Sequence, residues 1–201
     1  MTEFSRSARV SGLEARRSCQ QNSCYRLHSH DALSIGLIDE GTSVFSGPLG
    51  GTIRLAPGDV TVIASGQVHA CNPEKGRWVY QMIHADQDWC ESLTPSGASS
   101  PVFTGVRVLR QPKLRVLVEA FSNAVVADES VEGIETAGAA LFEALESVSP
   151  THVVTSAADP ELIERLTPVM ERLSSALGIA GPKKAINSLT GDTPLYPPRK
   201  K

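Results

Sequence analysis

Three histidines stand at positions where an antiparallel β domain could bring their rings together. His28 and His30 are two residues apart, so on a strand both side chains leave the same face. His69 follows a Gly-x-x-His turn, where another strand is expected to begin. Neutral imidazoles are good ligands for zinc, iron, copper or nickel. The spacing therefore predicts a cluster of imidazoles that either holds a metal ion or lines a pocket without one.

Residues 8 to 85 are expected to supply the strands that position this cluster. Turn signals such as Gly41 and Pro57-Gly58-Asp59 separate short runs rich in β-branched and aromatic residues. Such spacing is typical of a jelly-roll sandwich. Between residues 33 and 38, the apolar Leu33, Ile35 and Leu37 alternate with Ser34, Gly36 and Ile38. This alternation predicts a strand with one face in the core.

Helical periodicity replaces the strand pattern later in the chain. Apolar residues recur at helical spacing from Leu114 to Val125, from Ile134 to Val148 and from Leu162 to Leu177. A shorter helix is expected over residues 86–93, with an aspartate available as its cap, and a loop is expected over 94–100. The sequence thus predicts an α+β fold, a double-stranded β-sandwich (jelly roll) followed by an antiparallel helical module. The expected divisions are 1–95 for the sandwich, 96–180 for the helices and 181–201 for a disordered, basic, proline-rich tail.

Composition excludes several classes of protein. The net charge of −3 argues against a chain devoted to nucleic acid, whose usual footprint is a basic face. No apolar run is long enough to span a membrane, and the first residues lack the apolar core of a secretory signal. These features predict a cytoplasmic protein whose four cysteines are free thiols.

A series of linked motifs between residues 10 and 93 points to a family. In chain order the motifs are Arg26, His28-Ser-His30, Glu40-Gly41, Pro57-Gly58-Asp59, Gly66-Gln-Val-His69-Ala-Cys71-Asn72-Pro73 and Trp78-Val-Tyr80-Gln-Met82. This series resembles the N-terminal, cupin-like ligand-binding and dimerisation domain of AraC-type transcription regulators. The resemblance implies a non-enzymatic sensor, without a cofactor, that binds a small-molecule effector and forms a homodimer through its helices.

The resemblance also suggests which residues bind the effector. The ligand-binding candidates are His28, His30, His69, Trp78 and Tyr80. Trp78, Tyr80 and Met82 share one face of a strand, which is typical of core packing as well as of a pocket wall. The arm with Arg6, Arg9, Arg16 and Arg17 either folds over the pocket, as the family implies, or forms an edge strand.

Two further readings of the chain remain open. Nothing after the third predicted helix fits a helix-turn-helix, so direct DNA binding by this chain is not expected. The sequence is interpreted as a truncated regulator or as a stand-alone sensor. Such a chain could also act by forming mixed dimers with a full-length relative. The alternative from another class is a small metal-dependent cupin enzyme, a dioxygenase or isomerase, with His28, His30 and His69 as metal ligands. Ser34 weakens that alternative because it occupies the place where metal-binding cupins carry glutamate.

Overall fold

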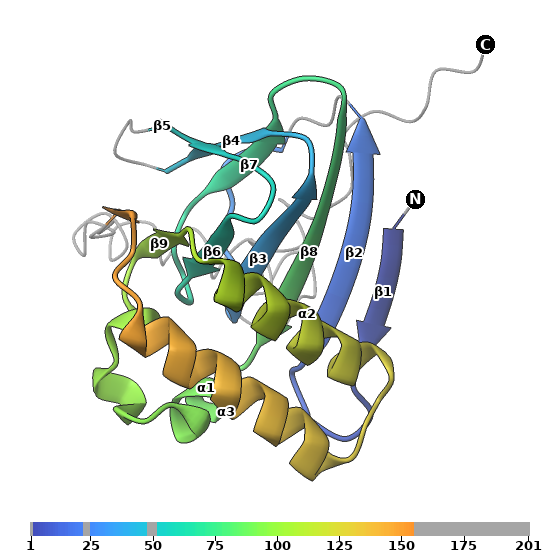
Figure 1. Cartoon of the computed structure of the whole chain (residues 1–201), viewed down its shortest axis with the longest axis vertical. Helices are drawn as coiled ribbons and strands as arrows, with labels where there is room; N and C mark the ends of the chain where they lie inside the picture. Colours follow the sequence, from blue (N-terminus) through green and yellow to red (C-terminus); the bar gives the residue numbers. More distant parts are fainter. Residues whose placement is uncertain (1, 22–24, 48–51, 155–201) are drawn as a thin grey trace, which may run out of the picture.

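The computed structural model describes residues 2–21, 25–47 and 52–154, and it forms a β-sandwich covered by helices on one side (Figure 1). The larger sheet has the strand order β1 (Thr2–Arg6), β2 (Glu14–Gln21), β8 (Arg77–Ala85), β3 (Leu33–Glu40), β6 (Val60–Ile63), β9 (Val106–Leu109) and β10 (His152–Val154). The smaller sheet has the order β5 (Thr52–Leu55), β4 (Ser43–Ser46) and β7 (Ala70–Pro73). All the strand pairs are antiparallel, as the predicted jelly-roll sandwich requires.

The helices form a layer on the large sheet. Their bounds are α1 (Gln87–Leu93), α2 (Pro112–Val126) and α3 (Val131–Ser147), with 3-10 turns η1 (Gly97–Ser99) and η2 (Pro101–Phe103) between α1 and β9. Helix α2 lies across β1, β2, β3 and β8, and α3 packs on α2 and α1 (Figure 1). The order of layers is therefore small sheet, large sheet, helices.

This layering buries both faces of β3, which corrects the expectation of a single core face. Leu33, Ile35 and Leu37 join the apolar cluster between the large sheet and the helices. The alternate residues face the small sheet, where Ile38 belongs to a second apolar cluster with Phe45 and Trp78. Because the large sheet is the middle layer, its central strand is covered on both sides.

The predicted helices within the described residues are confirmed, and the extent of the strands was underestimated. Asp86 caps α1 by accepting the Trp89 N–H at 3.0 Å. Strand β1 begins before residue 8, and β9 and β10 follow residue 85. The loop predicted over 94–100 contains η1, and the exposed His152 lies in β10.

The remaining predictions on organisation fall largely outside the described residues. The third helix over 162–177 and the tail over 181–201 both lie beyond residue 154. The boundary at residue 95 stays a prediction, while β9 and β10 complete the large sheet after it.

The N-terminal arm is an edge strand attached to the turn between α2 and α3. Asp128 stands just after α2 with φ +47°, and the Asp128 and Glu129 amides donate to carbonyls of the last helical turn. This is the Schellman arrangement, in which glycine is the usual residue at that position. Here the aspartate side chain accepts from Ser7 Oγ at 3.1 Å and from the Ala8 amide at 3.2 Å. The aspartate therefore holds the arm at a position where glycine would fit the backbone better.

Candidate functional site

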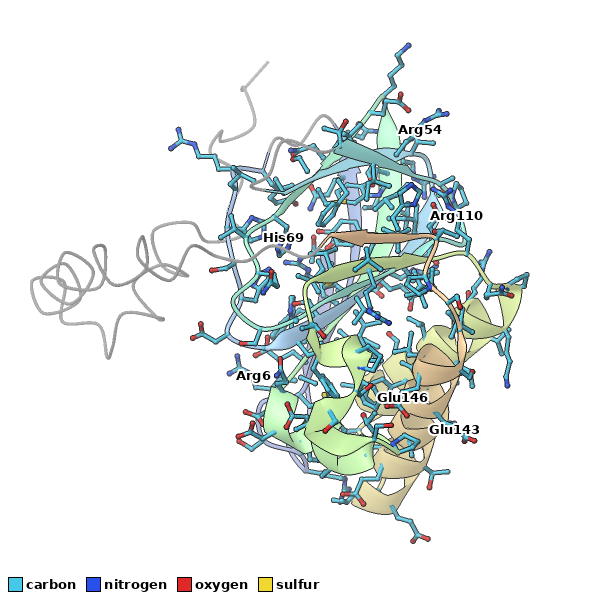
Figure 2. All side chains as sticks on the ribbon, turned by 90° about the vertical axis from the view of Figure 1, so that its left-hand side faces the viewer. Arg6, Arg54, His69, Arg110, Glu143 and Glu146 are labelled. Atoms are coloured by element: carbon cyan, nitrogen blue, oxygen red, sulfur yellow. The ribbon has the colours of Figure 1, made fainter. Side chains whose placement is uncertain are left out.

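The three predicted histidines meet between the two sheets, although neither His28 nor His30 lies on a regular strand. His28 and His69 form an isolated antiparallel bridge, in which each amide donates to the other carbonyl at 2.9 and 2.8 Å. Ring centroids are 4.6 Å apart for His28 and His69, 4.9 Å for His28 and His30, and 5.4 Å for His30 and His69. The strand β7 begins at the residue after His69, as predicted. Figure 2 shows His69 among the strands, away from Glu143 and Glu146 on α3.

Two backbone carbonyls fix the protonation pattern of this cluster. His28 Nδ1 lies 2.8 Å from the Arg26 carbonyl oxygen, and His69 Nδ1 lies 3.0 Å from that of Gln67. A carbonyl oxygen only accepts, so each Nδ1 carries the proton and donates it. In the neutral ring Nε2 then carries the lone pair, which can bind a metal ion or accept from a hydrogen-bond donor on a ligand.

The donor set fits a divalent metal ion only after the rings move toward one another. Ligand nitrogens of His28, His30 and His69 lie within 4.8 Å of one another. Tetrahedral zinc–imidazole bonds of roughly 2.1 Å place two nitrogens on one ion about 3.4 Å apart. The nitrogens that are farthest apart would therefore have to approach by up to about 1.4 Å. A carbonyl bonded to Nδ1 is the usual outer partner of a metal-binding histidine, whereas no carboxylate ligand joins the three among the described residues.

A second wall of the same cavity comes from β8. Trp78, Tyr80 and Met82 leave one face of the strand and line the cavity together with the three histidines. Trp78 and Tyr80 are buried and stacked, with centroids 4.1 Å apart, and they also belong to the apolar cluster between the sheets. Core packing and pocket lining, proposed as alternatives for these side chains, therefore coincide.

Two side chains near the cavity were not singled out as site residues from the sequence. Arg16 on β2 lines the cavity, donates to the Tyr80 hydroxyl at 3.3 Å and lies over the Tyr80 ring. The ring of His84 lies 4.6 Å from that of His30, and its Nδ1 is 2.9 Å from Ser34 Oγ. Ser34, expected to stand at the position of the cupin glutamate, is thus hydrogen bonded to a fourth histidine, His84. The pairing of β2 and β3 with β8 brings both contacts about, and no local pattern announces it.

The thiol of Cys71 lies in the cavity wall but is not poised to react. Phe45 pairs with Cys71 across β4 and β7, and it stacks on the His69 ring at 5.9 Å. Burial raises the pKa of Cys71 to about 11, against a smaller lowering by its contact with Ser43 Oγ. A thiol that stays protonated is a poor nucleophile and a poor metal ligand at neutral pH.

The cavity is small in this structure. Its volume is about 40 Å³, and it is lined by residues of both sheets. One water needs roughly 10–15 Å³ by this measure, so about three water-sized particles fit. A metal ion or a ligand of a few heavy atoms matches that space, whereas larger effectors need side chains to move.

The fold and the site together define a cupin-like sandwich with a histidine-lined cavity, and comparison with known proteins assigns the chain to a family. A family model described as AraC-like ligand binding domain matches residues 10–145. The chain therefore belongs to the family of AraC-like ligand-binding domains. A search of curated proteins gives no match.

Several solved structures are similar to this chain at low sequence identity. ToxT from Vibrio cholerae is 9% identical, with a TM-score of 0.51, and the match covers 89% of this chain and 76% of ToxT. A cupin superfamily protein from Desulfitobacterium hafniense is 18% identical over 43% of this chain and 78% of its own, with a TM-score of 0.37. A mutant of oxalate decarboxylase from Bacillus subtilis is 16% identical over 42% of this chain and 26% of its own, with a TM-score of 0.33. Within the described residues, no helix has the length and apolarity that crossing a membrane requires.

Proposed function

We propose that this chain is the ligand-sensing and dimerisation portion of an AraC-type transcription regulator, and that its effector binds in the cavity between the two sheets. The observation that carries the proposal is the cavity itself, in which His28, His30 and His69 meet beside Trp78 and Tyr80. It combines apolar walls with a few polar groups, as small-molecule sites do. The family is one of ligand-binding domains, which supports a role in sensing rather than catalysis.

The contacts around the cavity suggest how binding would reach the helices. Arg16 in the cavity wall is paired in register with Phe4 of β1, so the arm is one strand away from the ligand. Asp128 joins the same arm to the turn between α2 and α3. A ligand that favours one position of β2 would shift the equilibrium between two arrangements of arm and helices.

Dimerisation through the helical layer is the second part of the proposal. Val116 and Val126 on α2 and Val131 at the start of α3 are exposed by 62%, 57% and 42%. Exposed apolar side chains on these two helices are available to a protein interface. Sedimentation analysis should find a dimer that Val126→Glu weakens, and a monomer at all concentrations would contradict this part.

A thermal-shift screen with sugars, organic acids and aromatic metabolites tests the sensing role. A ligand that binds only the folded state raises the melting temperature. His30→Gln should abolish the shift, whereas His152→Gln, at an exposed position in β10, should preserve it. A shift of equal size in both variants would mean that the ligand binds outside the cavity, and would count against the proposal.

The second candidate, a metal-dependent cupin enzyme, is favoured by one specific observation. Carbonyls hold the Nδ1 protons of His28 and His69, so the lone pairs that could bind a metal ion are on the Nε2 atoms. A bound ion would supply Lewis-acid or redox chemistry, with His28, His30 and His69 as its ligands. Stoichiometric iron, nickel or zinc in the purified protein, lost on His69→Ala and kept in His152→Gln, would favour this candidate. Metal-free protein that still binds an effector would exclude it.

A further inference from the structure

The described polar side chains that line the cavity carry no negative charge, and hydrogen-bond donors and acceptors lie on different walls. Arg16 contributes a guanidinium, and no aspartate or glutamate is among the described residues that line the cavity. The three imidazoles add no negative charge. The wall is therefore neutral to positive, which favours a ligand that carries a negative charge.

Hydrogen-bond donors gather on the wall formed by β2 and β8. The Trp78 indole N–H is buried, in a side chain only 2% exposed, and has no acceptor among the described residues. An indole N–H can only donate, and a buried donor without an acceptor is costly. The Tyr80 hydroxyl oxygen accepts from Arg16, which leaves its own proton available to another acceptor. Trp78, Tyr80 and Arg16 together match a carboxylate, which has two oxygens and no donor of its own.

The opposite wall has the complementary character. With the protons of His28 and His69 fixed on Nδ1 by backbone carbonyls, their Nε2 lone pairs are acceptors. Such acceptors match a hydroxyl group. The cavity of about 40 Å³ holds about three water-sized particles, so a ligand of about six heavy atoms enters only when side chains of the wall move.

We infer that the cavity binds a small hydroxy acid, with its carboxylate on Arg16, Trp78 and Tyr80 and its hydroxyl on the imidazoles of His28 and His69. The inference rests on the proposed function, because it concerns the chemistry of the effector at the same site. The carboxylate of the ligand then contacts the large sheet and its hydroxyl contacts the histidines near the small sheet, so binding links β8 to the start of β7. Neither a neutral sugar-like ligand nor a simple fatty acid satisfies both walls.

Three closely matched compounds test the inference on the full chain treated with EDTA. Sodium lactate has both groups, sodium propionate lacks the hydroxyl, and lactamide lacks the charge. At a saturating concentration, lactate should raise the melting temperature by about 5 °C. Propionate should give a smaller shift and lactamide none, with sodium chloride matching the ionic strength throughout.

Variants on the neighbouring strands β2 and β8 identify the side chains that bind the carboxylate. Arg16→Gln and Trp78→Phe should each weaken lactate binding by about 10- to 100-fold in calorimetric titration, since each removes a hydrogen bond to a carboxylate. Arg17→Gln is the matched control, because Arg17 is the next residue on β2 and pairs with Asp39 outside the cavity. It should leave lactate binding unchanged.

The possible failures are distinguishable. Equal shifts with lactamide and lactate, lost in His30→Gln, would overturn the acidic ligand and leave the sensing role in place. Equal shifts with propionate and lactate would overturn the hydroxyl on the imidazoles. A lactate shift that appears only with added zinc would assign the carboxylate to a metal ion and overturn the role of Arg16. If no compound of this set or of the wider screen binds, the inference and the proposed function fall together.

Discussion

Asp128 offers a stringent test of how the arm is held to the helices. Its backbone is left-handed, at φ +47°, and its side chain accepts hydrogen bonds from Ser7 and from the Ala8 amide. Three substitutions separate these two effects. Asp128→Ala removes the acceptor and keeps a Cβ in the left-handed region, Asp128→Gly removes the acceptor and relieves the backbone, and Asp128→Asn keeps an oxygen acceptor and tolerates the backbone.

The expected losses follow from these contacts. Each hydrogen bond to this partly exposed carboxylate contributes about 1 kcal/mol, and a Cβ in the left-handed region, which aspartate and alanine share, costs about 1 kcal/mol relative to glycine. The free energy of unfolding should therefore fall by about 2 kcal/mol in Asp128→Ala, by about 1 in Asp128→Gly and by less than about 1 in Asp128→Asn. The loss should thus be largest for alanine, intermediate for glycine and smallest for asparagine.

Urea unfolding measures the three differences, and hydrogen exchange locates them. Exchange of the Ala8 amide should accelerate in the alanine and glycine variants and much less in the asparagine variant, because only the first two lose its acceptor. A glycine variant as stable as the wild type, with an unchanged Ala8 amide, would refute the attachment of the arm by Asp128.

Two other outcomes follow from the structure. Gly41→Ala should lower the free energy of unfolding by about 3 kcal/mol or more, because its φ is +76° and an added Cβ would lie 2.3 Å from the Arg77 carbonyl oxygen. Gly76→Ala is the control, with φ +67° and no described atom within 4 Å of the added Cβ, and should cost only about 1 kcal/mol in the same urea titration; equal losses would contradict the role of the close approach. In native protein at pH 8, iodoacetamide should leave Cys71 and Cys90 unmodified in peptide mass mapping, since burial raises the pKa of both thiols, that of Cys71 to about 11. As the pH rises toward 11, the rate of Cys71 modification should increase about tenfold per pH unit, because the thiolate fraction does. Rapid labelling at pH 8 would show that the cavity wall is open.

The histidine cluster could be predicted because local signals define it. A spacing of two residues puts His28 and His30 on one side of an extended segment, and the Gly-x-x-His turn marks where His69 enters the next strand. The bridge between His28 and His69 then brings the rings together. The strand pattern over residues 77–83 similarly predicted that Trp78 and Tyr80 lie on the same face of a strand.

Features that depend on contacts between distant segments were missed. Arg16 reaches the cavity only through the register of β2 on β8, where it pairs with Met82. Strands β9 and β10 have four and three residues, too few to show a periodic pattern. Only one face of β3 was expected in the core, because the small sheet that covers its other face comes from other parts of the chain. The left-handed role of Asp128 was hidden because aspartate there is not the glycine that usually marks the end of a helix.

One fluorescence titration addresses the central claim, that the effector binds between the two sheets. Trp78 lines the cavity, whereas Trp89 lies on α1 near Phe121, so Trp89→Phe leaves the cavity residue as the only tryptophan. A compound that raises the melting temperature should change the Trp78 emission of this variant until it saturates. The midpoint of this fluorescence titration should equal the midpoint of the compound's binding isotherm. Unchanged Trp78 emission at full saturation of the same compound would place the ligand elsewhere and contradict the account.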